Sequence, residues 1–229
     1  MSSRCDALET LVRIVASVGK VKLIRISVEN GGFVTNKPAA LRCELFEMVT
    51  ENPDFVPFFL RLLVPGCELK IRSARDCAVE KILKDPAVFD TDVIKSAPSI
   101  SISWRTAVTD EQIVQLQAET ISMGAPSITS RGIIQLLLEW IEGKRKITCI
   151  KLNCLRSINK EEIFRGINSA NLQPLSMFPW IIFPQQERHG IAYNSAIICN
   201  VTGDVLAVFA SEISCLLQAY HRRISPHPT

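Results

Sequence analysis

The chain has 229 residues, of which 47% are hydrophobic and 21% charged, which excludes a disordered or collagen-like chain and allows one large core. Its net charge of +3 comes from 26 Lys and Arg against 23 Asp and Glu spread along the sequence, so we expect no nucleic-acid partner. No segment resembles a secretory signal or a membrane span. We therefore expect a cytoplasmic or nuclear protein with no membrane contact, whose eight cysteines are reduced and mostly buried.

The first ninety residues predict strands that are each followed by a helix. Residues 21–28 alternate apolar and polar side chains and include several β-branched ones, which is typical of a half-buried strand. A helix is expected from Pro38 to Asn52, because apolar residues recur there at helical spacing. Residues 67–72 again have the pattern of a strand, and Ser73 is placed to cap a following helix.

The segment from 92 to 167 continues this alternation with stronger signals. Thr109 and Gln112 have the spacing of a capping box at the start of a short helix. Thr129 is placed to cap the most apolar helix of the chain, which includes Trp140 and ends at Gly143. Apolar residues lie on more than one side of this helix, so we expect it to pack on two sides, with a partner groove along one flank as the alternative. The other expected elements are strands at 99–104, 118–123 and 147–152 and a helix capped by Asn159.

The last part of the chain no longer shows the alternation of strands and helices. Proline becomes frequent, and residues 191–199 and 204–209 predict two strands joined by a turn at Thr202-Gly203. The sequence as a whole predicts an α/β fold of leucine-rich-repeat-like strand–helix units with mostly parallel strands in 1–167. Residues 168–229 are expected to close the same compact domain with an antiparallel hairpin.

Motifs that bring a catalytic or nucleotide-binding mechanism with them do not occur in the sequence. The histidines are His189, His221 and His227, all near the carboxyl end, and His189 has the setting of a solvated loop residue. Cys149 and Cys154 lack the further ligands of a tetrahedral zinc site and are expected to be buried thiols. We therefore predict no catalytic residue, no metal and no cofactor, and a chain that is not an enzyme.

A basic cluster, Lys144-Arg145-Lys146, follows the helix that ends at Gly143. Cations at the carboxyl end of a helix complement its dipole, and this is the role that we expect for the cluster. Recognition of an anionic patch is the alternative.

Consecutive segments between residues 92 and 167 carry a further pattern. A strand ending at Trp104 leads to a threonine-capped acidic helix start at Thr109, and the next helix ends in Trp140 and Gly143. The strand at 147–152 and an acidic helix that contains Gly166 complete the series. In order and spacing these segments resemble the nematode F-box-associated domain of type 2. The residues that match its motifs are Trp104, Thr109, Trp140, Gly143 and Gly166, and we expect these residues to have structural roles.

This resemblance implies a protein–protein interaction module. In such proteins an F-box contacts a Skp-type adaptor of a cullin-RING ubiquitin ligase, and the associated domain holds the protein to be ubiquitinated. No F-box pattern precedes Val21, and the turn at Thr202-Gly203 departs from the Asp-Gly usual in the family. The alternatives are a truncated paralogue that binds targets without delivering them to a ligase, and a cysteine-dependent hydrolase.

Overall fold

The computed structural model describes residues 10, 14, 17–28, 41–74, 81–153, 156, 158–173, 194–211 and 213–220. The parallel strands are β1 (Lys20–Val28), β2 (Arg42–Thr50), β3 (Glu68–Arg72), β4 (Ile82–Leu83), β5 (Ser99–Thr106), β6 (Thr120–Gly124) and β7 (Cys149–Asn153). The antiparallel strands are β8 (Leu172–Gln173), β9 (Asn194–Cys199), β10 (Val205–Ala210) and β11 (Ser214–Tyr220). They form one 11-stranded sheet in the order β1-β2-β3-β5-β6-β7-β11-β10-β9-β8, with β4 paired to β5 beside this path. The chain is therefore an α/β protein with a mixed sheet.

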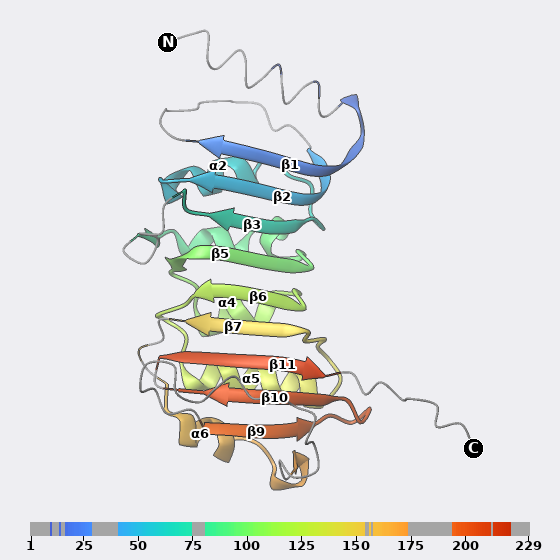
Figure 1. The fold of residues 1–229 in the computed structure, drawn as a ribbon, viewed down its shortest axis with the longest axis vertical. Helices are drawn as coiled ribbons and strands as arrows, with labels where there is room; N and C mark the ends of the chain where they lie inside the picture. The colour runs from blue at the N-terminus through green and yellow to red at the C-terminus, as the bar shows by residue number, and fades with distance from the viewer. Residues whose placement is uncertain are drawn as a thin grey trace, which may run out of the picture.

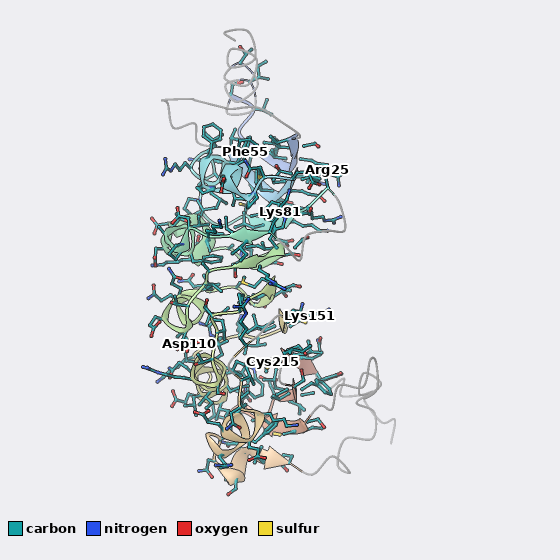
Figure 2. The ribbon with its side chains drawn as sticks, turned by 90° about the vertical axis from the view of Figure 1, so that its left-hand side faces the viewer. Arg25, Phe55, Lys81, Asp110, Lys151 and Cys215 are labelled. Carbon is teal, nitrogen blue, oxygen red and sulfur yellow. The ribbon has the colours of Figure 1, made fainter. Side chains whose placement is uncertain are left out.

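The helices cover one side of this sheet (Figures 1 and 2). They are α2 (Val56–Leu60), α3 (Asp92–Lys95), α4 (Asp110–Gln115), α5 (Ser130–Ile141) and α6 (Lys160–Arg165), with 3₁₀ turns η1 (Pro53–Phe55), η3 (Pro86–Asp90) and η4 (Ser169–Asn171). Between them and the sheet lies the main core, which contains Trp104, Phe46 and Phe89. Within the described residues, no helix combines the length and the apolarity that crossing a membrane requires.

All five strands expected from the sequence lie in this sheet, at 21–28, 67–72, 99–104, 118–123 and 147–152. Each adjacent pair along β1-β2-β3-β5-β6-β7 is parallel, so these five strands run in the same direction. In β5, Ile100, Ile102 and Trp104 are buried toward the helices, while the serines between them are more exposed. Alternation of this kind gives a strand one apolar and one polar face, which is why period-2 patterns identified these elements.

The helix expected from Pro38 to Asn52 is wrong, since Arg42–Thr50 forms β2, which inserts between β1 and β3. Its fully buried residues Phe46, Met48 and Thr50 recur with the period of a strand. Apolar residues at helical spacing over only two turns are equally compatible with this strand, and the β-branched pair Val49-Thr50 favours it. Residues 29–40 lie outside the described part of the chain.

The helix expected after Ser73 is also incorrect at its end, because Ile82–Leu83 forms the short strand β4 beside β5. Residues 75–80, where most of that helix was expected, lie outside the described residues. Leu83 is buried although it pairs over only two positions. A two-residue strand is stabilised almost entirely by its neighbour and carries no periodicity of its own.

The antiparallel hairpin of β9 and β10 is confirmed, with its turn at Thr202-Gly203. The sequence analysis missed β11, which lies between β7 and β10 and is antiparallel to both. The hairpin therefore joins the parallel strands only through β11. In β11, Cys215 and Leu217 are buried, while Leu216 between them is half-buried and packs against a second cluster with Phe209 on the side away from the helices. Apolar residues on both faces interrupt the alternation of apolar and polar side chains that identifies a strand.

Side chains connect the amino ends of successive helices. Thr109 and Gln112 form the expected capping box of α4. Gln112 also donates from Nε2 to the Asp90 carboxylate of η3 at 2.8 Å. The Asp110 carboxylate accepts hydrogen bonds from the backbone N (2.8 Å) and the hydroxyl (2.5 Å) of Thr129, the N-cap of α5.

One helix further along, the backbone N of Asn159, the N-cap of α6, donates to the Ser130 hydroxyl at 2.8 Å. The starts of α4, α5 and α6 are thus linked through Asp110 and Ser130, and Gln112, which also caps α4, connects this helix to the preceding turn η3.

Gly132→Ala is expected to destabilise the protein, although alanine is the better helix former. A Cβ at position 132 would lie 2.4 Å from Oδ1 of Asp110 and would displace this carboxylate from Thr129. In an Asp110→Ala background the same substitution should cost much less, because the carboxylate is gone and only the approach to the Cβ of residue 110 at 3.2 Å is left. Urea unfolding of the four proteins in this double-mutant cycle measures the difference between the two backgrounds, and an equal effect of Gly132→Ala in both would contradict the packing described.

Candidate binding surface on the open face of the sheet

The side of strands β1 to β7 that points away from the helices is the candidate functional site, which we call the open face. Figure 2 shows Arg25 and Lys151 on this side, opposite the helices. Alternate residues of each strand form the open face. They include Val21, Leu23, Arg25, Ser27, Cys43, Leu45, Glu47, Val49, Glu68, Lys70, Arg72, Ser99, Ser101, Ser103, Arg105, Thr120, Ser122, Gly124, Cys149, Lys151 and Asn153.

The pairing register aligns these side chains in rows across the strands. Lys70 pairs with Ser101, Ser101 with Ser122, and Ser122 with Lys151. Two lysines therefore flank two serines on four neighbouring strands. Because serine side chains are short, the surface is lower between the lysines than at their positions.

A hollow of about 270 Å³ opens beside this row, toward the carboxyl ends of β5, β6 and β7. Polar lining is supplied by Ser101, Ser103, Ser122, Arg105 and Asn153, and Gly124 adds only backbone. A Cβ on Gly124 would lie 3.1 Å from the Cα of Arg105, so glycine lets β6 pass close to the irregular pairing at Ile102/Arg105. The hollow thus results from small residues next to an irregular strand.

Positive charge predominates on the open face. Its cations are Arg25, Lys70, Arg72, Arg105 and Lys151, and its carboxylates are Glu47 and Glu68. Glu47 is buried and is bound by Arg25 at 2.6 Å and Arg72 at 3.3 Å. The hydrogen bond from Arg25, with the charges of Arg25, Arg72 and Lys70, holds the pKa of Glu47 below its usual value. This corner of the face is neutralised internally.

The other cations of the open face are not paired with carboxylates in this way. Within the described residues, Lys70, Arg105 and Lys151 form no ion pair closer than 4.0 Å, and the Nε of Arg105 is buried without a hydrogen-bond partner. A buried donor that lacks an acceptor carries a desolvation cost that a bound acceptor would relieve. The side of the open face over β3 to β7 therefore presents unmatched positive charge next to a polar hollow.

The residues singled out from the sequence lie elsewhere. Trp104 is fully buried on the helix side of β5, and its indole N–H has no acceptor among the described groups. Thr109 caps α4. Trp140 is 3% exposed, Gly143 ends α5 in the left-handed region at φ +71°, and Gly166 packs against Ile134. None of these side chains is exposed on the open face, and of these residues Trp104 also borders the hollow.

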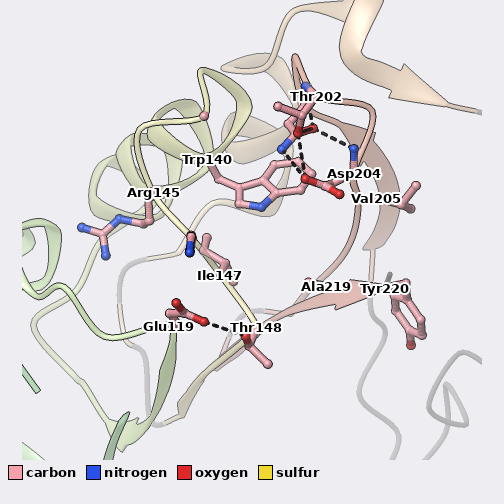
Figure 3. Close-up of a pocket in the computed structure, with 13 residues that line it drawn as sticks. Glu119, Trp140, Arg145, Ile147, Thr148, Thr202, Asp204, Val205, Ala219 and Tyr220 are labelled. Atoms are coloured by element: carbon pink, nitrogen blue, oxygen red, sulfur yellow. Dashed lines mark hydrogen bonds between the residues drawn. The ribbon is translucent and has the colours of Figure 1, made fainter. Parts of the chain in front are cut away.

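Trp140 and Gly143 line a second pocket of about 370 Å³, where the loop after α5 meets the β9–β10 turn (Figure 3). The polar groups of that turn bind one another, since the hydroxyl of Thr202 donates toward Asn200 and Asp204 at 2.8 and 2.7 Å. The turn is attached to α5 by a hydrogen bond from the Val201 N to the Ile141 carbonyl. Because the polar groups of the turn bind one another and the turn is attached to α5, we interpret this pocket as a junction between structural parts.

One residue of the basic cluster after α5 has a role that the sequence analysis did not predict. The Arg145 side chain is 9% exposed, pairs with Glu139 at 2.9 Å, and donates to the backbone carbonyls of Leu116 and Val114. Its side chain thereby caps the carboxyl end of α4, while its backbone N donates to the Glu139 carbonyl of α5. Lys144 is exposed and pairs with Glu142, which raises the pKa of its ammonium through a hydrogen bond.

The described cysteines are free thiols. Cys43, Cys67 and Cys215 are buried, and Cys149 and Cys199 are half-buried. Burial raises the pKa of Cys215 to about 12 and also raises that of Cys149. A hydrogen bond with Cys43, together with burial, raises the pKa of Cys67, and the same hydrogen bond lowers the pKa of Cys43. Thiols of raised pKa are poor nucleophiles at neutral pH, since the thiolate is the reactive form.

Several residues considered in the sequence fall outside the described part of the chain, namely Cys154, His189, His221 and His227. Among the described residues, no group of three or more His, Cys, Asp and Glu is arranged to hold a metal ion.

Sequence reasoning missed the open face as a site. A signal was present in Ser99 to Ser103, where serine occupies every second position of a strand and leaves one face small and polar. Comparison with protein-family models, curated proteins and solved structures gives no match to this chain. The function therefore has to be inferred from the geometry of the open face and from the motif resemblance.

Proposed function

We propose that this chain is a protein–protein interaction module that resembles the substrate-recognition part of F-box proteins in cullin-RING ubiquitin ligases. The observation that supports this function best is the open face, where a polar, hollowed sheet surface carries unmatched cations and no described helix packs on it. A half-covered sheet whose free side is polar and indented is suited to binding another macromolecule. On this proposal the chain is not an enzyme.

The way in which the helix starts are connected supports the idea of leucine-rich-repeat-like units. Between β5 and α6 each unit contains a strand, a loop and a capped helix, and the first turns of successive helices are linked through Asp110 and Ser130. Proteins built from such stacked units use the extended surface along the stack for recognition. Here that surface is the open face.

The position of the resemblance supports the same proposal. Residues 92–167 contain β5, β6 and β7, and these strands supply the residues that line the hollow. The part of the chain that resembles the nematode F-box-associated domain of type 2 is therefore the part that carries the candidate surface. The motif residues would hold the scaffold, and Ser101, Ser103 and Ser122 would face the target.

Immunoprecipitation of the tagged full chain from nematode cells, followed by mass spectrometry, tests the proposal. We expect Skp-type adaptor and cullin peptides together with a target protein. A target without adaptor and cullin supports the truncated paralogue, and the absence of all three contradicts a recognition module.

A steric variant locates the target on the open face. Ser103→Arg places a long side chain at the hollow, where residue 103 is exposed, and should abolish capture of the target. Ser169→Arg, at an exposed position of η4, adds the same charge away from this face and should retain the target. Equal capture by both variants would contradict the open face as the binding surface.

A further inference from the structure

We infer that the open face binds an acidic protein segment, which crosses strands β3, β5, β6 and β7 above the hollow. This inference rests on the proposed function and adds the chemistry of the partner. Lys70, Arg105 and Lys151 are the charged groups that would meet carboxylates of the segment.

Charge complementarity is the first argument. The Glu47 carboxylate is bound by Arg25 and Arg72, and Glu68 is the other carboxylate of the open face. Lys70, Arg105 and Lys151 are left without an ion pair among the described residues. A partner that brings several carboxylates would neutralise them, and opposite charges also accelerate association.

The register supplies the second argument. Lys70 and Lys151 lie in the same row, three strand spacings apart, which corresponds to about 14 Å. An extended segment covers this distance in about four residues. Between the lysines the row contains only Ser101 and Ser122, so the segment meets no bulky side chain as it crosses the strands.

The hollow supplies the third argument. It offers the hydroxyls of Ser101, Ser103 and Ser122, the amide of Asn153 and the guanidinium of Arg105. Arg105 retains a buried Nε donor with no acceptor. A glutamate side chain entering a space of about 270 Å³ would form with the Arg105 guanidinium the short, charge-assisted hydrogen bonds that such groups favour.

A protein segment fits these features better than a nucleic acid does. Single-stranded nucleic acids are held by aromatic side chains that stack on the bases. Among the described residues of β1 to β7, the open face has no aromatic side chain. Its cations are also too few for the dense phosphate contacts that dominate nucleic-acid affinity.

Fluorescence anisotropy with a labelled hexaglutamate peptide tests the inference on the full chain at low salt. We expect saturable binding that weakens with added salt, and no binding of hexaserine.

Lys70→Glu/Lys151→Glu should weaken hexaglutamate binding by about tenfold. Arg131→Glu/Lys160→Glu changes the net charge equally on α5 and α6 and should change binding by less than about twofold. Thermal unfolding of each protein checks folding, and Lys70→Gln/Lys151→Gln serves as the milder pair, with an expected loss of about threefold.

Three results would overturn the inference. They are a failure of the native chain to bind hexaglutamate, an equal loss for the two charge-reversed pairs, and tighter binding of a labelled hexauridylate RNA that is lost in Lys70→Glu/Lys151→Glu. If hexaglutamate fails while Ser103→Arg still abolishes target capture, the acidic partner is wrong and the recognition module stands. If hexaglutamate binds as expected while cells provide neither target nor adaptor, the proposed function fails instead.

Discussion

Trp140→Ala is expected to reduce the free energy of unfolding by about 3–5 kcal/mol, the usual cost of deleting a large buried aromatic side chain. Trp140 lies near the end of α5 and is 3% exposed within the main core. Its removal would leave a cavity at the junction of α5 and the β9–β10 turn, which the surrounding strands cannot fill. Guanidinium unfolding followed by circular dichroism measures the change.

Val201→Ala is the matched control, because this residue belongs to the same junction but is 74% exposed. It should change stability by less than about 0.5 kcal/mol. A Trp140→Ala protein that melts within about two degrees of the parent would contradict the core role. The indole would then be available as a binding residue in the pocket of Figure 3.

Arg145→Ala should be about as costly, at about 3–5 kcal/mol, because it breaks a buried ion pair and leaves other groups unpaired. The guanidinium is 9% exposed and binds Glu139 together with the carbonyls of Val114 and Leu116. Without it, the last turn of α4 loses its cap, and the Glu139 carboxylate stays half-buried without its cation. Urea unfolding provides the measurement.

The neighbouring Lys144→Ala removes the same charge at an exposed position and should leave stability unchanged within error. A Glu139→Ala/Arg145→Ala double variant should lose less than the sum of the two single variants, since the pair is coupled. If Arg145→Ala and Lys144→Ala were equally mild, Arg145 would not be the structural link between α4 and α5.

Much of the fold was predictable from local signals. The capping box of Thr109 and Gln112, the caps Thr129 and Asn159, and the turn at Thr202-Gly203 are all in place. Each of these signals involves residues within a few positions of one another, so the sequence contains the whole of the interaction. The alternating strand at 99–104 belongs to the same class, because its period follows from one covered face.

The errors occur where burial depends on distant segments. β2 was mistaken for a helix because its apolar spacing fits either period, and its position between β1 and β3 decides for the strand. β11 escaped notice because Leu216 interrupts its alternation of apolar and polar residues, and the packing of Leu216 beside Phe209 depends on the position of β11 next to β10. In both strands the deciding contacts come from other strands of the sheet.

The sequence by itself determined the elements with local caps and alternating faces, and with them the α/β class. The tertiary structure decided the site. Lys70 and Lys151 are far apart in the chain, and only the parallel register of β3, β5, β6 and β7 places them around Ser101 and Ser122. The same holds for Arg145, whose carbonyl partners belong to another helix. Such contacts depend on how strands pair and helices pack, which no short stretch of sequence encodes.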